Sequence, residues 1–183
     1  GPSSASAAWR KSWAYNVGVA AASCDLVICH DGDILVPARY AAELLHRFSD
    51  SRLEVLHPQR FLFYLDRASS ERIRLPSRLQ ACTPAMVSQN WRGGTLAIRR
   101  SCFQAIGGFD ERFVDWGGED DEFYERCALL QQDSYGYLPF VHLWHPPQPS
   151  KSGPSRQQSE RFLQQILQVP ACQRASALLT SLQ

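Results

Sequence analysis

The sequence predicts an α/β domain, in which strands and helices alternate along the chain. Short apolar runs that suit buried strands, such as "DLVICH" at 25–30 and "TLAIR" at 95–99, alternate with segments whose apolar residues recur at helical spacing. The composition supports one folded domain, because 44% hydrophobic and 11% aromatic residues in a chain of 183 can fill a core. A disordered tail protein is therefore not expected.

The first part of the chain predicts a helix, a strand, a second helix and a long apolar run. Residues 7–24 carry small and apolar residues at helical spacing and lead into the strand at 25–30. Residues 38–50 place their apolar side chains on one helical face. The run at 53–65 predicts one or two strands, broken at Pro58.

The pattern weakens in the middle of the chain and then returns. Residues 66–89 are charged and weakly periodic, which predicts a surface loop or a short helix. The strand at 95–99 precedes a helix at 101–109, with Ser101 as its N-cap and a glycine pair at its end.

The last part of the chain predicts two helical regions around one strand. A helix with an acidic first turn is expected after Gly118, followed by a strand at 134–145. Proline, serine and glycine then dominate a stretch typical of a mobile loop. Beyond it we expect a helix capped by Ser159 and a shorter one from about Ala171.

The chain divides into three parts. Residues 1–8 look like a tag or linker remnant, 9–148 form the main folded part, and 149–183 hold the mobile loop and the C-terminal helices. The six cysteines show neither close C-x-x-C pairing nor the density of a disulfide scaffold. We therefore expect reduced thiols.

Charge and hydropathy exclude several classes of partner. The net charge is +1, from 19 basic and 18 acidic residues, so the overall charge does not favour nucleic acid or an anionic membrane. No apolar run approaches the ~18 residues that would span a bilayer, and no signal segment opens the chain. We expect a cytoplasmic protein with neither a nucleic-acid partner nor a transmembrane segment.

Two carboxylates follow the first predicted strand. Asp31 and Asp33 lie two residues apart, so in an extended segment both side chains point the same way. They can share one hard cation, or bind one cation and one ribose hydroxyl. The alternative is a turn in which Asp and Gly satisfy local backbone groups. The carboxyl end of a strand favours the ligand site, because ligands of open α/β sheets gather there.

The block "WGGEDDEF" at 116–123 joins a tryptophan and two glycines to a run of acids. The helix dipole explains acids at the start of a helix, but it does not explain the glycines. Such a hinge would let Trp116 swing over a ligand while the helix fixes the carboxylates, as in many sugar sites. A carboxylate held in this way can act as general base toward a hydroxyl.

Two histidines close the last predicted strand. His142 and His145 can converge at a strand end if the backbone turns, which Pro146 and Pro147 favour. Together with the aspartate pair they would form a mixed oxygen and nitrogen site for a divalent ion such as Mn²⁺. For His142 a purely structural role is the alternative.

Three segments, in this order, resemble the β-1,4-galactosyltransferases and bacterial glycosyltransferases with a galactosyltransferase-type C-terminal region. The resemblance covers about residues 10–148, in the segments "NVGVAAASCDLVICHDGDILVP", "WRGGTLAIRRSCFQAIGGFDERFVDWGGEDDEFYERC" and "HLWH". It implies a GT-A fold, with a mixed sheet flanked by helices. It also implies an inverting transfer of galactose or an N-acetylhexosamine from a UDP-sugar to a hydroxyl of a bacterial glycan, with Mn²⁺ or Mg²⁺ as cofactor.

The resemblance assigns metal and base roles to four residues. Asp33 and His145 match metal ligands of the family, and His142 falls where some members use a methionine ligand. Asp31 matches the first member of the family's D-x-D motif, which lies nearer the nucleotide but is counted here as a further candidate ligand. Asp120 matches the catalytic base.

The resemblance also assigns the sugar-binding positions. Glu119 and Asp121 match the carboxylates that hold the acceptor, and Trp116 matches a loop tryptophan that closes on both sugars. The donor pocket would be lined by Gly93 and Gly94.

Family members begin with a βαβ half that binds uracil and ribose, and this chain starts after the point where that half would end. An incomplete sheet exposes an edge and apolar surface, so we expect a homodimer or a partner chain that completes it. Two other functions stay open. One is a non-catalytic carbohydrate-binding or assembly module derived from such a transferase, and the other is a metal-dependent hydrolase that uses the aspartates and histidines.

Overall fold

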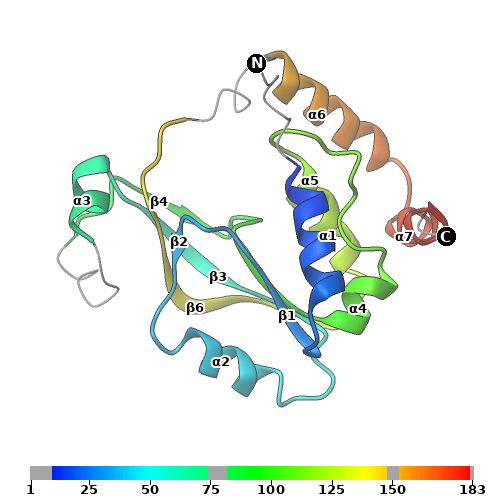
Figure 1. The fold of residues 1–183 in the computed structure, drawn as a ribbon, viewed down its shortest axis with the longest axis horizontal. Coiled ribbons are helices and arrows are strands. Elements are labelled where there is room, and N and C mark those ends of the chain that lie inside the picture. Colours follow the sequence, from blue (N-terminus) through cyan, green and yellow to red (C-terminus); the bar gives the residue numbers. More distant parts are fainter. Residues whose placement is uncertain (1–9, 74–81, 148–152, 182–183) are drawn as a thin grey trace, which may run out of the picture. The chain divides into compact units, whose positions relative to one another are not determined.

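The computed structural model describes residues 10–73, 82–147 and 153–181 and divides into two compact units (Figure 1). The first unit comprises Gly1–Cys24, Phe103–Leu129 and Pro147–Gln183. The second unit comprises Asp25–Cys102 and Leu130–Pro146. The C-terminal helices therefore belong to the same unit as the N-terminal helix.

The second unit is built on one six-stranded mixed sheet in the order β1-β5-β3-β6-β2, with β4 paired to β3. The strands are β1 (Leu26–His30), β2 (Ile34–Leu35), β3 (Val55–Tyr64), β4 (Met86–Gln89), β5 (Thr95–Arg99) and β6 (Gln132–His142). β3 and β6 are parallel, and the other pairs are antiparallel. The α/β class and the mixed sheet expected from the sequence are confirmed.

The core of the second unit lies between this sheet and α2 (Tyr40–Arg47). Helix α2 buries Tyr40 and Leu44 against strand residues that include Leu56 and Phe140. The Tyr40 hydroxyl lies 2.6 Å from Thr95 Oγ1, so its buried polar atom is hydrogen-bonded. The shorter α3 (Arg67–Arg72) follows β3 and is visible at the left of Figure 1.

Strand β3 continues through Pro58, so the predicted break is instead an irregularity in its pairing with β6. The register shifts on both sides of Gln59, because proline has no N–H for the ladder and a bulge accommodates it. Gly136 on β6 permits the close approach. A Cβ at that position would lie 2.9 Å from the Pro58 carbonyl oxygen.

The first unit is helical, and an aromatic stack forms the centre of its packing. Its helices are α1 (Lys11–Ala21), α4 (Arg100–Ala105, which begins in the second unit), α5 (Glu119–Cys127), α6 (Pro154–Ile166) and α7 (Ala171–Ser181). The rings of Phe109 and Phe123 stack with centroids 4.1 Å apart, and Phe103 packs 5.4 Å from Phe123. These three side chains are almost completely buried.

A buried ionic network ties α5 to α7. Glu122 accepts hydrogen bonds from Arg126 on its own helix and from Arg174 on α7. Arg126 also donates to the carbonyl oxygens of Ile106 and Gly108. Glu122 is 1% exposed and Arg126 is 0% exposed, so these charges depend on one another for solvation.

Three sequence predictions need correction. Residues 66–89 contain β4 as well as the short helix, since this exposed edge strand lacks the alternating apolar pattern of a half-buried one. Helix α4 begins at Arg100, directly after β5, so Ser101 lies inside it and is not its N-cap. Helix α6 begins at Pro154, a residue preorganised for the first helical turn, and Ser159 is buried within it.

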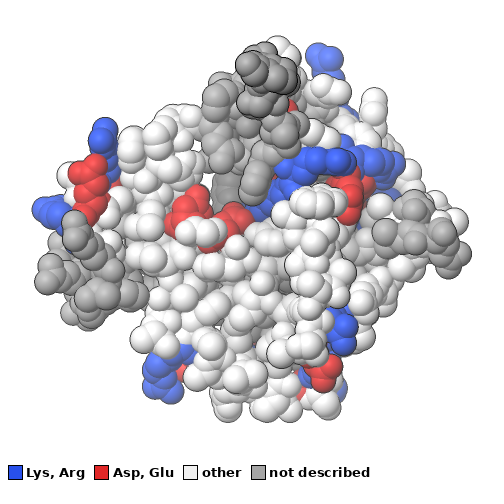
Figure 2. All heavy atoms as spheres, viewed as in Figure 1, with Lys and Arg blue, Asp and Glu red and all other residues white. Residues whose placement is uncertain are grey.

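The expectation of reduced thiols agrees with the structure. All six cysteines are free. Within the described residues, none of the helices combines the length and the apolar character needed to cross a membrane. Figure 2 shows one face of the molecule, on which basic and acidic side chains lie in small groups and most of the surface is uncharged.

Candidate functional site

Asp33, His142 and His145 converge in the second unit. Asp33 Oδ2 lies 3.5 Å from His142 Nε2 and 3.2 Å from His145 Nε2. One ligand atom from each residue falls within 4.8 Å of the other two, and no second group of this kind occurs in the part of the chain that the structure describes. The sequence predicts this convergence correctly, and metal binding itself stays a prediction.

The sheet explains why these side chains meet. β2 pairs with β6, which places Ile34 opposite His142 and so brings Asp33 next to the end of β6. The Leu143 N–H donates to the Asp33 carbonyl oxygen at 2.8 Å, which fixes the two backbones at this point. The chain then continues without regular structure to His145, whose imidazole reaches the same carboxylate.

The three side chains suit a divalent cation. One carboxylate oxygen and two imidazole nitrogens are donors that Mn²⁺ and similar ions accept. His145 Nδ1 lies 2.8 Å from the Pro146 carbonyl oxygen, so a proton on Nδ1 would leave Nε2 available on the side of Asp33. Side-chain exposures of 17% for His142 and 36% for Asp33 make both side chains partly accessible from solvent.

Asp31 lies outside this group, so the geometry does not support it as a metal ligand. Its backbone N–H donates to the Gly94 carbonyl oxygen at 2.8 Å, which holds the Gly93–Gly94 turn beside the aspartates. Gly94 has φ +82°, and a Cβ there would lie 2.6 Å from Ile34 Cδ1. Donor binding by Asp31, Gly93 and Gly94 stays a prediction.

The acidic block opens α5 in the first unit, as the sequence predicts. Gly118 precedes the helix with φ +90°, and a Cβ there would lie 2.7 Å from the Phe113 ring. Glu119 is 6% exposed, and its Oε2 accepts a hydrogen bond of 3.0 Å from the Gly117 N–H. The glycines are therefore needed for a tight turn as well as for any hinge motion.

Lys11 is a site residue that the sequence analysis missed. Its Nζ lies 2.9 Å from Asp120 Oδ2 and 3.7 Å from Glu119 Oε1. The first residue of α1 thus pairs with a carboxylate 109 positions away, and a single lysine gives no local signal of such a contact. An adjacent ammonium favours the charged form of a carboxylate.

The remaining predicted residues lie close to this acidic block in the chain. Arg156 of α6 places its guanidinium 5.3 Å from the centre of the Trp116 ring, so the tryptophan loop contacts α6. Asp121 is partly buried in the first turn of α5. Sugar binding by Trp116, Glu119 and Asp121 stays a prediction.

Glu119 should make stability depend on pH. Burial, with the nearby Asp120 charge, raises the pKa of Glu119 from 4.5 to about 7. Between these values the unfolded chain loses the proton and the folded chain keeps it, so the free energy of unfolding falls as the pH rises and levels off above about 7. At 1.36 kcal/mol per pKa unit the total is about 3 kcal/mol.

Urea unfolding at several pH values between about 4.5 and 8 tests this expectation when the chain is compared with Glu119→Gln. His57 acts in the opposite direction, because burial lowers its pKa from 6.5 to about 4. The difference between the two proteins cancels the His57 contribution. A difference that does not change with pH would contradict the assignment to Glu119.

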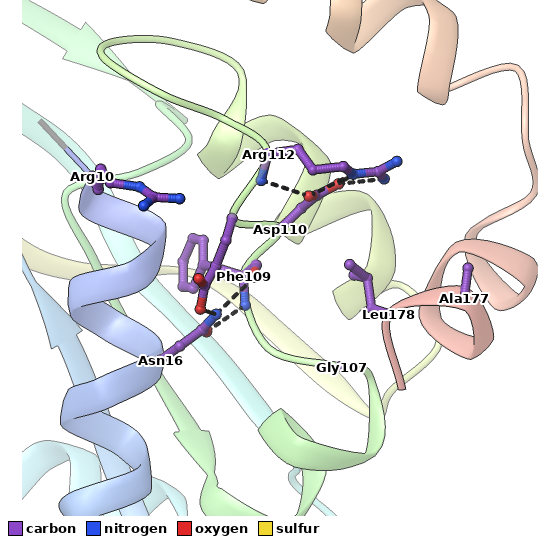
Figure 3. A pocket seen from close by; sticks show the side chains of 9 residues that line it. Arg10, Asn16, Gly107, Phe109, Asp110, Arg112, Ala177 and Leu178 are labelled. Atoms are coloured by element: carbon purple, nitrogen blue, oxygen red, sulfur yellow. Dashed lines mark hydrogen bonds and ion pairs between the residues drawn. The ribbon is translucent and has the colours of Figure 1, made fainter. Parts of the chain in front are cut away.

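The first unit contains cavities that are lined by described residues. A cavity of about 440 Å³ lies among α1, the turn after α4, and α7, where Asp110 pairs with Arg112 and Asn16 bonds the Phe109 backbone (Figure 3). A cavity of about 740 Å³ lies between residues 112–115 and α6. The sequence gives no signal of either cavity.

Comparison with known proteins gives this chain a family context. The family model described as the N-terminal domain of galactosyltransferase matches residues 74–138, which include the glycine pair and the acidic block. The resemblance to galactosyltransferases is confirmed. A search of curated proteins found no match.

Solved structures support the GT-A fold. The catalytic domain of Drosophila β1,4-galactosyltransferase 7 in complex with xylobiose is 24% identical, with a TM-score of 0.54 over 84% of this chain and 60% of that chain. A mutant of the fly enzyme with manganese, UDP-Gal and xylobiose is 23% identical, with a TM-score of 0.50 over 76% and 53%. GalNAc-T7 with UDP, GalNAc and Mn²⁺ is 15% identical, with a TM-score of 0.55 over 84% and 34%.

This galactosyltransferase-like chain thus spans 60% of the fly catalytic domain. The match at this level shows the fold. The predicted homodimer or completing partner chain stays a prediction.

Proposed function

We propose that this chain carries out a metal-assisted, inverting transfer of galactose or an N-acetylhexosamine from a UDP-sugar to a glycan hydroxyl. The observation that carries the proposal is the convergence of Asp33, His142 and His145. The match of residues 74–138 to the galactosyltransferase model supports a glycosyltransferase function. Related structures hold manganese with UDP-Gal, or Mn²⁺ with UDP.

Asp33, His142 and His145 would hold the divalent cation. When bound, the cation supplies positive charge that offsets the negative charge on the leaving diphosphate. Asp31 and the Gly93–Gly94 turn are held together by the Asp31 N–H, which suits them to line the donor next to the ion.

Asp120 would act as general base. Its carboxylate would take the acceptor proton while the acceptor oxygen bonds to the anomeric carbon and the bond from that carbon to the UDP oxygen breaks. Attack from the side opposite the leaving group inverts the anomeric centre. Lys11 favours the charged form of Asp120, whereas burial raises the pKa of Glu119 to about 7. Two neighbouring carboxylates in such different environments can take different roles.

Glu119, Asp121 and Trp116 would hold the acceptor, with Trp116 also reaching the donor sugar. A planar aromatic ring offers a face to a sugar ring, and partly buried carboxylates accept hydrogen bonds from its hydroxyls. The contact between Trp116 and Arg156 would allow α6 to restrain the tryptophan loop.

Titration calorimetry with Mn²⁺, followed by UDP, tests the metal site. We expect Asp33→Ala to weaken Mn²⁺ binding by at least about tenfold, because one of three converging ligands is lost. Asp31→Ala is the matched control, since it lies in the same motif but outside the converging group, and it should keep most of the Mn²⁺ affinity. Equal Mn²⁺ binding by the original chain and Asp33→Ala would overturn the proposed metal site.

An assay of UDP release from UDP-sugars with and without glycan acceptors tests the reaction. Acceptor-dependent release with an inverted product supports the transferase. Glycan binding without Mn²⁺ and without UDP release would favour the carbohydrate-binding module. Equal product formation without acceptor would favour the hydrolase.

A further inference from the structure

The ring of Tyr64 stacks on the imidazole of His142. The two ring centroids lie 4.7 Å apart with 29° between the planes, and Tyr64 pairs with His142 in the parallel register of β3 and β6. The Tyr64 hydroxyl hydrogen-bonds with the side chain of Ser88, on the paired strand β4. Burial raises the pKa of Tyr64, and the charge of Asp33 acts in the same direction, so the phenol stays neutral.

The residues after Tyr64 hold the backbone on which both histidines lie. The Leu65 N–H donates to the His142 carbonyl oxygen at 3.0 Å. The Trp144 N–H donates to Ser70 Oγ at 2.7 Å. These bonds fix the main chain at His142 and again directly before His145.

Helix α3 is held in place by contacts of its own, so the position of Ser70 on it is well defined. Asp66 Oδ1 accepts a hydrogen bond of 2.6 Å from the Ser69 N–H and so caps the helix. The Arg67 guanidinium lies 5.3 Å from the centre of the Trp144 ring, which adds a cation–π contact between α3 and the residue before His145. The short segment from Tyr64 to Ser70 therefore contacts the segment His142–His145 at four places.

Such contacts matter because the ligands are otherwise free to rotate. The segment His142–His145 begins at the last residue of β6, and its side chains lose rotational freedom when they bind an ion. A ring stacked on His142 restricts the imidazole before the ion arrives. Outer contacts of this kind typically change metal affinity about 10–100-fold.

We propose that Tyr64 is a positioning residue that holds the His142 imidazole ready to bind the cation, and that Ser70 does the same for the Trp144–His145 backbone. This inference rests on the proposed function, because it assumes that the converging residues bind a divalent ion. Tyr64 acts through its ring, so a phenylalanine at this position should preserve the Mn²⁺ affinity.

Mn²⁺ titration calorimetry on the full chain tests the inference. We expect Tyr64→Leu to weaken Mn²⁺ binding about tenfold, Ser70→Ala to weaken it severalfold, and Tyr64→Phe to stay within about twofold of the original affinity. Phe63→Leu is the matched control, because it removes a neighbouring ring from the opposite face of β3 and should leave Mn²⁺ affinity unchanged. The absorption spectrum of bound Co²⁺ should change in Tyr64→Leu and not in Phe63→Leu.

The outcomes separate the two proposals. If the original chain binds Mn²⁺ and Tyr64→Leu binds it equally well, the positioning role is wrong and the metal site stands. The same holds if Tyr64→Phe loses as much affinity as Tyr64→Leu, or if Phe63→Leu loses as much. If the original chain binds no Mn²⁺, both the metal site and the positioning role fall. Thermal unfolding without metal shows whether Tyr64→Leu folds. If it does not, Ser70→Ala carries the test, and unchanged Mn²⁺ affinity in that variant would contradict the positioning role.

Discussion

Replacement of Asp120 by asparagine is expected to lower kcat for sugar transfer by about 10²–10⁴-fold, the range in which a general base contributes. The amide keeps the size of the side chain but cannot accept the proton of the acceptor hydroxyl. It also removes the charge that pairs with Lys11 at 2.9 Å, while Glu119 Oε1 stays 3.7 Å from the same ammonium. Acceptor-dependent UDP release under saturating Mn²⁺ and UDP-sugar is the measurement.

Two further measurements make the Asp120 result specific. Mn²⁺ affinity should not change in Asp120→Asn, because Asp120 is not part of the converging metal group. Glu125→Gln, one turn later on α5, is the matched control and should keep kcat within about twofold. Unchanged kcat in Asp120→Asn, or a larger loss in Asp121→Asn than in Asp120→Asn, would show that another carboxylate is the base.

The sequence predicts strands best where burial produces a recognisable apolar pattern. The apolar runs at 25–30 and 95–99 correspond to β1 and β5 within a residue, because β5 is almost wholly buried and β1 buries Val27 and Cys29. β4 escaped prediction because Met86 and Val87 are exposed on a short edge strand, where no alternation is required. Pro58 predicted a break in the strand, but β3 continues through it and only its pairing with β6 is irregular.

The residues of the candidate site also differ in whether the sequence could predict them. Asp33 and His145 could be predicted because each lies at a strand end, where the sheet limits the possible positions. Lys11 could not, because its contact with Asp120 depends on how α1 packs and leaves no local pattern. Tyr64 could not either, since its stacking on His142 depends on the register between β3 and β6.

The buried ion network of Glu122 is a third feature that the sequence does not reveal. Removal of Glu122 should have the largest effect on stability. Glu122 and Arg126 have the i, i+4 spacing of an ordinary surface pair, but Arg174 of α7 closes over them and buries all three. Glu122→Ala would leave two buried guanidinium groups without their carboxylate. We expect a loss of about 3–5 kcal/mol, as for other buried ion pairs that lose one partner.

Urea unfolding measures this loss, and Glu43→Ala provides the control. Glu43 pairs with Arg39 at the same i, i+4 spacing on α2, but the Arg39 side chain is 83% exposed, so its removal should cost about 0.5 kcal/mol or less. A similar small cost for Glu122→Ala would show that the buried network contributes little. Replacing Glu122, Arg126 and Arg174 together by apolar residues should recover much of the stability, because no unpaired charge then stays buried.

The same variant separates folding from catalysis. Glu122 lies in the first turn of α5, three residues after Glu119, so the network that anchors the helix also fixes the start of the acidic block. The combined apolar variant should therefore unfold cooperatively and retain the ion pair between Lys11 and Asp120. If it is stable but transfers sugar as poorly as Asp120→Asn, the buried charges orient α5 for the reaction and do more than stabilise it. If it is stable and active, packing alone is enough to hold the helix.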